Sequence, residues 1–421
     1  MQEEYLHYLF KQKLLPNSYL TSKGEQLEVI NRGVHNHNAG PDFLEGKICF
    51  DNKIWAGHIE FHVKSSDWYK HNHQIDDNYN NVIVHFVYEN DGPVFINNFE
   101  IPTIEIKDYV DHGHYQHYVS YRNSKDWIPC ANQIQKVDPY YIFHQKEKAL
   151  LSRLIRKSDV IIEDIKRYKG NQYKGFWIAL GKIFGGKVNA DVFAELAQKI
   201  ELHHLAKLNY DQLDLEAYCF GLAGFLDSNE KRDDYFELLK EKYDYQKNLF
   251  HLQSLQAKAW KFSRMRPGSF PTIRLAQFAA ILAETKGEYH FFETNQLNKL
   301  SISLSPYWKK HHHFNKPSKQ NHAGISPAFK ALITINAFLP FLFAQGTIVN
   351  HSHLREKALE ELRHVKPEYN SIIKQWKAHH VPVDNAFDSQ ALIEMKNEFC
   401  DHSKCLQCAI GVQLLKPKKE G

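Results

Sequence analysis

The sequence predicts an α+β protein in which a small mixed β-sheet domain, residues 1–138, precedes a larger all-helical domain, residues 139–421. Three observations predict this class. Strand-like apolar runs and turn dipeptides fill the first 110 or so positions. From about Pro139 onward, apolar residues recur with the helical spacing of i, i+3 and i+4. The composition, 43% hydrophobic and 24% charged over 421 residues, is that of a globular chain long enough for two or three domains.

The first domain is expected to open with a short helix over residues 3–13 and to continue as a sheet. Asp51-Asn52-Lys53 separates two strand-like runs and predicts a tight hairpin turn. The expected strands are Gln26–Asn31, Phe43–Phe50, Ile54–Lys64, Asn81–Glu89, Val94–Phe95 and Ile101–Lys107.

The second domain is expected to consist of helices joined by short connections. Residues 305–326 lack periodicity and predict a long basic loop. The expected helices cover residues 140–166, 175–184, 190–205, 213–226, 233–243, 274–285, 291–300, 353–363, 368–379 and 389–399.

Charge and hydropathy exclude several classes of protein. Lys and Arg number 53 and Asp and Glu 49, so the formal net charge is 53 − 49 = +4. Any nucleic-acid binding would therefore use local basic patches. No run approaches the roughly 18 uncharged apolar residues of a membrane span, and Ala337–Ala344 is expected to be core. We therefore expect a cytoplasmic protein without membrane contact; the oligomeric state stays open.

The most informative segment runs from Asn38 to Trp68. Strand alternation places Glu60, His62 and Lys64 on one face and apolar residues on the other. Asp42 lies 18 residues before Glu60, at the entry to the preceding strand and after Gly40-Pro41. The simple explanation of these three ionisable residues is a sheet face exposed to solvent. The aspartate that precedes the strands, Asp42, argues against that explanation.

This pattern suits metal-dependent hydrolysis of phosphodiesters. Asp42 and Glu60 would bind Mg²⁺ or Mn²⁺ through carboxylate oxygens. Lys64 would stabilise charge on the phosphate, and His62 would be a ligand or would orient one. The hypothesis requires that the Asp42, Glu60 and Lys64 side chains converge.

Pro41-Asp42 followed by Glu60-x-His62-x-Lys64 resembles the signature of the restriction-endonuclease-like nucleases, the PD-(D/E)xK fold. The resemblance implies a nuclease acting on DNA or RNA, with a helix, a hairpin carrying the acids, a helix or loop and a further strand. This chain departs from the signature, because His62 stands where the lysine is expected. GPDF, GHIEFHVKSSDWYKHNH, RPGSFPTIRLAQ and CLQCAIG together resemble an uncharacterised bacterial family known only as a domain of unknown function.

Histidines offer an alternative use of the same region. His62, His71 and His73 could form a Zn²⁺ or Mn²⁺ site of a hydrolase acting on a small molecule. His71 and His73 could equally be loop residues, and His85 is expected to be a hydrogen-bonded core histidine. Asp67 could be a helix cap or a turn former.

The cysteines predict a second metal site. Cys400, Cys405 and Cys408 fall within nine residues, and Cys130 or His402 could complete a set of four ligands for Zn²⁺ or an iron–sulfur cluster. One early cysteine with three late ones is similar to the iron–sulfur staple of some RecB-type exonucleases. Three ordinary buried cysteines on a terminal helix are the alternative.

Two basic segments could contact nucleic acid. Arg264, Arg266 and Arg274 precede or begin a helix and could bind phosphate or pair with acids. Residues 309–319 are basic, with Tyr307, Trp308 and Phe314 interleaved or nearby, which suits stacking on single strands. A non-catalytic scaffold for nucleic acid or a protein partner is the other function class that the sequence allows.

Overall fold

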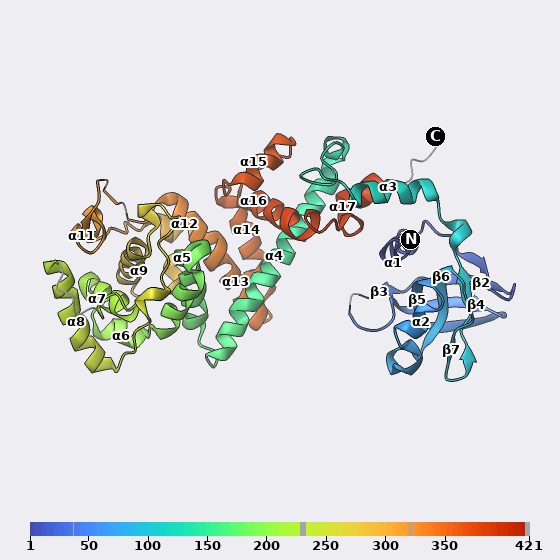
Figure 1. Ribbon diagram of the computed structural model, residues 1–421, viewed down its shortest axis with the longest axis horizontal. Coiled ribbons are helices and arrows are strands. Elements are labelled where there is room, and N and C mark those ends of the chain that lie inside the picture. The colour runs from blue at the N-terminus through green and yellow to red at the C-terminus, as the bar shows by residue number, and fades with distance from the viewer. Residues whose placement is uncertain (37, 228–232, 320, 323, 417–421) are drawn as a thin grey trace. The chain divides into compact units, whose positions relative to one another are not determined.

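The computed structural model describes residues 1–36, 38–227, 233–319, 321–322 and 324–416. The chain forms two compact units (Figure 1). The first comprises Met1–Gln145 and the C-terminal segment that begins at Lys396, and the second comprises Lys146–Met395. The predicted helical domain included this C-terminal segment, which instead packs in the unit that contains the sheet.

A seven-stranded mixed sheet forms the centre of the first unit, with the strand order β1-β2-β4-β5-β6-β9 and with β3 paired to β4. The strands from β1 to β5 pair antiparallel, whereas β5, β6 and β9 run parallel. Their bounds are β1 Ser18–Leu20, β2 Gln26–Asn31, β3 Val34–His35, β4 Phe43–Phe50, β5 Lys53–Lys64, β6 Val82–Glu89 and β9 Thr103–Glu105. The predicted fold class, a mixed sheet followed by a helical region, is confirmed.

The hairpin between β4 and β5 forms as the sequence predicts. Phe50 pairs with Lys53, so Asp51 and Asn52 form a two-residue turn, with φ of 50° and 56°. Positive φ at both positions is the requirement of a type I′ turn, which aspartate and asparagine tolerate better than most residues. The register of this hairpin then shifts between Phe43 and Gly46. This irregularity lies directly after Asp42.

Short elements cover both faces of the sheet. Tyr5, Leu6 and Phe10 of α1 (Glu3–Lys11) share an apolar core with Phe61 and Phe86 of the sheet. A second small core surrounds Trp68. The remaining elements of this unit are α2 Asp67–Lys70, η1 His73–Ile75, η2 Asp77–Tyr79, β7 Phe95–Ile96, β8 Phe99–Glu100, η3 Lys107–Tyr109, α3 His112–Arg122, η4 Ile134–Lys136, η10 Cys405–Gln407 and α17 Ala409–Leu415.

The second unit is helical around one large apolar core. Helix α4 (Pro139–Arg167) leads into it from the first unit, and η9 (Met395–Cys400), a π-helix, leads out. Its other elements are α5 Gln172–Lys199, α6 Leu202–Lys207, α7 Gln212–Leu222, α8 Asp234–Phe250, η5 Ala257–Ala259, η6 Pro267–Ser269, α9 Pro271–Thr285, η7 Tyr289–Phe292, α10 Thr294–Lys299, α11 Pro306–Lys310, β10 His311–His313, β11 Lys316–Pro317, α12 Pro327–Ile333, η8 Thr334–Phe338, α13 Leu339–Ile348, α14 Ser352–His364, α15 Ser371–Ala378 and α16 Ala386–Glu394.

The run α12–η8–α13 is the one helix of the described residues that is both long and strongly apolar. By length and composition, residues Pro327–Ile348 could cross a membrane, and 67% of their most apolar window is buried inside the structure. Ala337–Ala344, predicted to be core, is buried within it. Residues 305–326, predicted to be a loop, contain α11 and the short hairpin β10–β11.

Candidate metal site on the mixed sheet

Asp42 and Glu60 meet where β4 begins beside the middle of β5. The backbone N–H of Asp42 donates to Oε2 of Glu60 at 3.0 Å, and the backbone N–H of Phe61 donates to Oδ2 of Asp42 at 2.9 Å. These reciprocal bonds hold both carboxylates against neighbouring strands. The structure therefore brings together the two acids that the sequence predicts as a pair.

Helix α1 adds two residues that sequence reasoning missed. Nε2 of His7 lies 3.1 Å from Oδ2 of Asp42. Glu3, His7 and Asp42 each offer a ligand atom, and these atoms lie within 4.8 Å of one another. Glu3 and His7 are spaced i, i+4, which places them on one helix face. That spacing was the available signal, although nothing in the sequence indicated which face meets the sheet.

Three histidines form a second group beside the first. Nε2 of His62 lies 3.1 Å from Nδ1 of His71. The ligand atoms of His62, His71 and His73 all lie within 4.8 Å of one another. His62 and His73 are buried, whereas His71 is exposed. The histidine alternative that the sequence left open therefore has its three residues in one place.

Glu60 lies between the two groups. Its Oε2 faces Asp42, and its Oε1 lies 3.5 Å from Nε2 of His73 and 3.8 Å from Nε2 of His62. Only 3% of Glu60 is exposed, and no Lys or Arg of the described chain lies within ion-pair distance of it. Burial, reinforced by the charges of Asp42 and Glu3, raises the pKa of Glu60 to about 10. A buried carboxyl with this environment favours either a proton or a bound cation.

Two of the neighbouring histidines, His62 and His73, are held in the neutral form. Burial, with the nearby histidines adding to it, lowers the pKa of His62 to about 2 and that of His73 to about 4. Nδ1 of His62 and Nε2 of His85 share a hydrogen bond at 2.8 Å. His85 is the buried, hydrogen-bonded core histidine that the sequence predicts. Neutral imidazoles are the form that binds metal ions.

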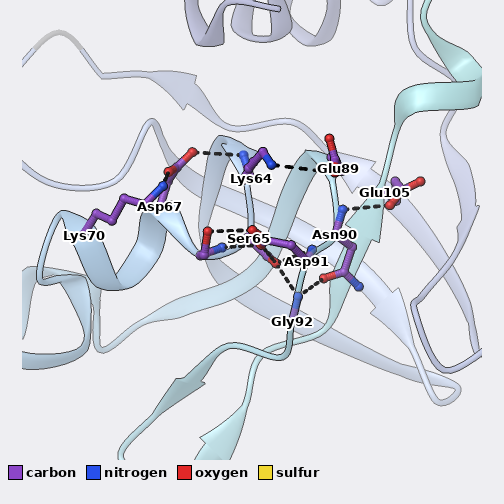
Figure 2. A network of polar contacts seen from close by, with 10 residues as sticks. Lys64, Ser65, Asp67, Lys70, Glu89, Asn90, Asp91, Gly92 and Glu105 are labelled. Carbon is purple, nitrogen blue, oxygen red and sulfur yellow. Dashed lines mark hydrogen bonds and ion pairs between the residues drawn. The ribbon is translucent and has the colours of Figure 1, made fainter.

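Lys64 does not join Asp42 and Glu60. Figure 2 shows its side chain beside Glu89. Its Nζ lies 3.7 Å from Oε1 of Glu89, and its side chain is 46% exposed. Its backbone N–H donates to Asp67, which also pairs with Lys70. Strand alternation predicted that Lys64 lies on the same sheet face as Glu60 and His62. It did not predict the direction of the side chain, because a long side chain at a strand end can turn toward solvent and a neighbouring acid. The convergence that the hypothesis requires is therefore not met: Asp42 and Glu60 meet, but Lys64 lies with Glu89, and its predicted role at the phosphate is wrong.

The four cysteines of the predicted second site lie in the first unit. Burial raises the pKa of Cys130 and Cys405 to about 12, and the pKa of Cys400 rises for the same reason. The neighbouring thiols raise these pKa values further, with Cys408 acting on all three and Cys130 acting on Cys400. Charges act in this way only between nearby groups. His402, the alternative fourth ligand, is exposed.

The predicted stacking surface in the basic segment is wrong for two of its rings. Trp308 is 0% exposed and Phe314 is 2% exposed, and both belong to the apolar core of the helical unit. Burying these large rings there removes them from any contact with bases. The structure thus directs Trp308 and Phe314 inward.

Arg274, one of the arginines predicted to bind phosphate or to pair with acids, lies over the Phe329 ring at 4.0 Å and donates to Gln277 at 2.8 Å. A cavity of about 360 Å³ lies beside these residues.

The sequence also matches a known family over most of its length. Residues 3–371 match the family described as "Protein of unknown function (DUF2851)". The chain belongs to this family. No curated protein matches the chain, and no solved structure matches it. Membership in DUF2851 agrees with the resemblance in the sequence motifs.

Proposed function

We propose that this DUF2851 protein is a metal-dependent phosphodiesterase that hydrolyses DNA or RNA. One observation carries the proposal: Asp42, directly before β4, and Glu60, on β5, are joined by hydrogen bonds between the strands, and Asp42 also meets Glu3 and His7 of α1. Carboxylate oxygens with one imidazole suit Mg²⁺ or Mn²⁺.

The residues present fit such an ion. Glu60 is buried, and no Lys or Arg of the described residues forms an ion pair with it. A divalent ion would therefore supply the positive charge that balances the ionised carboxylate of Glu60. When bound, the ion would polarise the phosphate and lower the pKa of the attacking water. Asp42 and Glu60 would hold it, with Glu3 as a further oxygen donor. His7 would orient Asp42, because its Nε2 lies 3.1 Å from Oδ2 of that residue.

The order of elements supports a nuclease-like assignment. Helix α1, the antiparallel hairpin β4–β5 beside the two acids, helix α2 and the parallel strand β6 come in this order along the chain, with β1, β2 and β3 between α1 and β4. This is the order implied by the resemblance to restriction-endonuclease-like nucleases. The proposal gives Lys64 no role, because its side chain pairs with Glu89.

Cleavage of labelled DNA and RNA by the full chain with Mg²⁺ or Mn²⁺ tests this function. Glu60→Gln should lower the rate about 100-fold or more, because it removes a charged metal ligand while keeping the shape of the side chain. Glu89→Gln is the matched control: it changes an acid on the neighbouring strand and should keep wild-type activity. Equal cleavage by wild type and Glu60→Gln would contradict the proposal.

The same experiment also tests two other functions. Glu60-dependent hydrolysis of small phosphodiesters, with none of DNA or RNA, would support the small-molecule hydrolase that the histidine group suggests. Retention of DNA or RNA without any hydrolysis would support the scaffold. The burial of Glu60 and His62, which are 3% and 0% exposed, favours a site over a solvated sheet face.

We also propose that Cys130, Cys400, Cys405 and Cys408 bind a structural zinc ion or an iron–sulfur cluster. The spacing of Cys400, Cys405 and Cys408 within nine residues, and the placement of all four cysteines in the unit that contains the sheet, support a common site. Four thiolates suit either group.

A further inference from the structure

Among the described residues, only histidines lie within ion-pair distance of Asp42 and Glu60, the two acids of the proposed phosphodiesterase. Phosphate hydrolysis requires a charge that stabilises the transition state, and the sequence had assigned this role to Lys64. In the structure, Lys64 lies with Glu89, and no other Lys or Arg of the described chain pairs with Glu60 or Asp42. A second cation beside the ion held by Asp42 and Glu60 would add to this charge.

We infer that a second divalent metal ion binds to His62, His71 and His73 and shares Glu60 with the ion of the acidic group. This inference rests on the proposed function and specifies which ions supply the positive charge of its site. The ligand atoms of the three histidines lie within 4.8 Å of one another. Three imidazoles with an open position form a known type of catalytic zinc site.

Packing orients two of these imidazoles from outside the group. His85 holds the far nitrogen of His62 at 2.8 Å, which leaves Nε2 of His62 directed toward His71. Tyr79 stacks on His73, with ring centroids 3.8 Å apart and an interplanar angle of 19°. Partners that fix the second ring nitrogen or the ring plane are typical of metal-binding histidines. His71 is the exposed member, so the site opens to solvent on its side.

Glu60 offers one oxygen to each group. Oε2 accepts from the backbone of Asp42 on the acidic side, whereas Oε1 faces His73 and His62 at 3.5 and 3.8 Å. A carboxylate in this position can bridge two ions. In two-metal hydrolases the ions are about 3.5–4 Å apart, and together they stabilise the attacking and leaving oxygens.

The two groups differ in the ions that they favour. Glu3, Asp42 and Glu60 provide mainly oxygen and suit Mg²⁺ or Mn²⁺, whereas the three imidazoles suit Zn²⁺. The reaction itself is a hydrolysis: water oxygen bonds to phosphorus, the ester P–O bond breaks, and the proton lost by water ends on the leaving oxygen. No other reactant is required.

Zinc stoichiometry tests the second ion independently of activity. The metal-free full chain is titrated with Zn²⁺ against a chromophoric chelator. His71→Ala/His73→Ala should bind one equivalent fewer than wild type and should cleave substrate at least 10-fold more slowly. His112→Ala/His117→Ala, which removes two exposed histidines of α3 in the same unit, should match wild type in both measurements.

The outcomes separate this inference from the proposed function. Equal zinc stoichiometry of wild type and the His71/His73 variant overturns the inference, even if Glu60→Gln remains inactive. Loss of one zinc without a change in cleavage overturns the charge-stabilising role. Asp42→Asn should retain the histidine-bound zinc while losing activity. Wild-type activity of Asp42→Asn and Glu60→Gln would contradict the proposed function itself.

Discussion

At the scale of single residues, buried glutamates have different roles in the two units. Glu60 is buried next to candidate metal ligands, whereas Glu216 of α7 is buried at 0% exposure among neutral partners. Tyr235 and Ser305 donate to Oε2 of Glu216 at 2.5 and 3.2 Å, and Gln212 donates to Oε1 at 3.4 Å. Neutral donors satisfy the oxygen atoms of Glu216, so this residue is explained as a core hydrogen-bonding group.

Glu216 should make the stability of the helical unit depend on pH. Burial raises its pKa from 4.5 to about 7. Between these values the folded state binds more protons than the unfolded state, so stability is highest at low pH and falls as pH rises. From pH 5 to 8, the unfolding free energy should fall by about 2 kcal/mol more in wild type than in Glu216→Gln.

Chemical denaturation at several pH values measures this difference. Glu284→Gln, at an exposed position of α9, is the control and should follow wild type. The same pH slope in wild type and Glu216→Gln would show that Glu216 ionises normally in the folded unit.

At the scale of elements, the β4–β5 hairpin positions the candidate site. Its turn fixes the register from Phe50 to Gly46, and the register shift between Gly46 and Phe43 then pairs Phe43 with Ile59 and brings Asp42 next to Glu60. A one-residue slip would move Glu60 and His62 to the opposite face of the sheet. The turn residues therefore influence a site at the far end of the hairpin.

The turn can be tested by changing Asn52, whose φ is 56°. Asn52→Gly should maintain or raise the unfolding free energy, because glycine adopts positive φ without a steric cost. Asn52→Ala should lower it by about 1 kcal/mol, since a Cβ without a polar side chain disfavours this conformation. Thermal or denaturant unfolding of both variants gives the order. An alanine variant as stable as wild type would contradict the turn assignment.

At the scale of the whole molecule, the chain returns to its first unit after forming the helical one. Residues from Lys396 onward belong with Met1–Gln145, and α17 contacts α3 within that unit (Figure 1). Ser403 donates to the carbonyl of Arg122 at 3.3 Å, and Gln145 accepts from the backbone of Ala409 at 2.8 Å. The proposed cysteine site would strengthen this closure.

Removing one cysteine should release both metal and the C-terminal segment. Cys130→Ser should lower the zinc or iron content of the purified chain by one site and speed proteolytic cleavage after residue 395, because the segment loses a bond to the sheet unit. Iron with visible absorption would identify a cluster, whereas zinc would identify a structural ion. Cys49→Ser, on β4, is the control and should keep the metal. Equal metal content in Cys130→Ser and wild type would contradict the site.

Local sequence patterns predict the fold class, most strands and helices, and Asp42 and Glu60 as a pair of acids. These features depend on periodicity, turn chemistry and the order of residues in one hairpin, which neighbouring residues encode. The motifs also determined the family, which the match over residues 3–371 confirms.

Only the tertiary structure decided which distant residues complete the candidate site. Glu3 and His7 meet Asp42 because an apolar face of α1 packs on the sheet, and Lys64 leaves the site because its side chain turns toward Glu89. Trp308 and Phe314 turn inward because burying their large apolar rings lowers the free energy relative to leaving them in water. Such choices depend on packing between segments far apart in the chain, which no local pattern encodes.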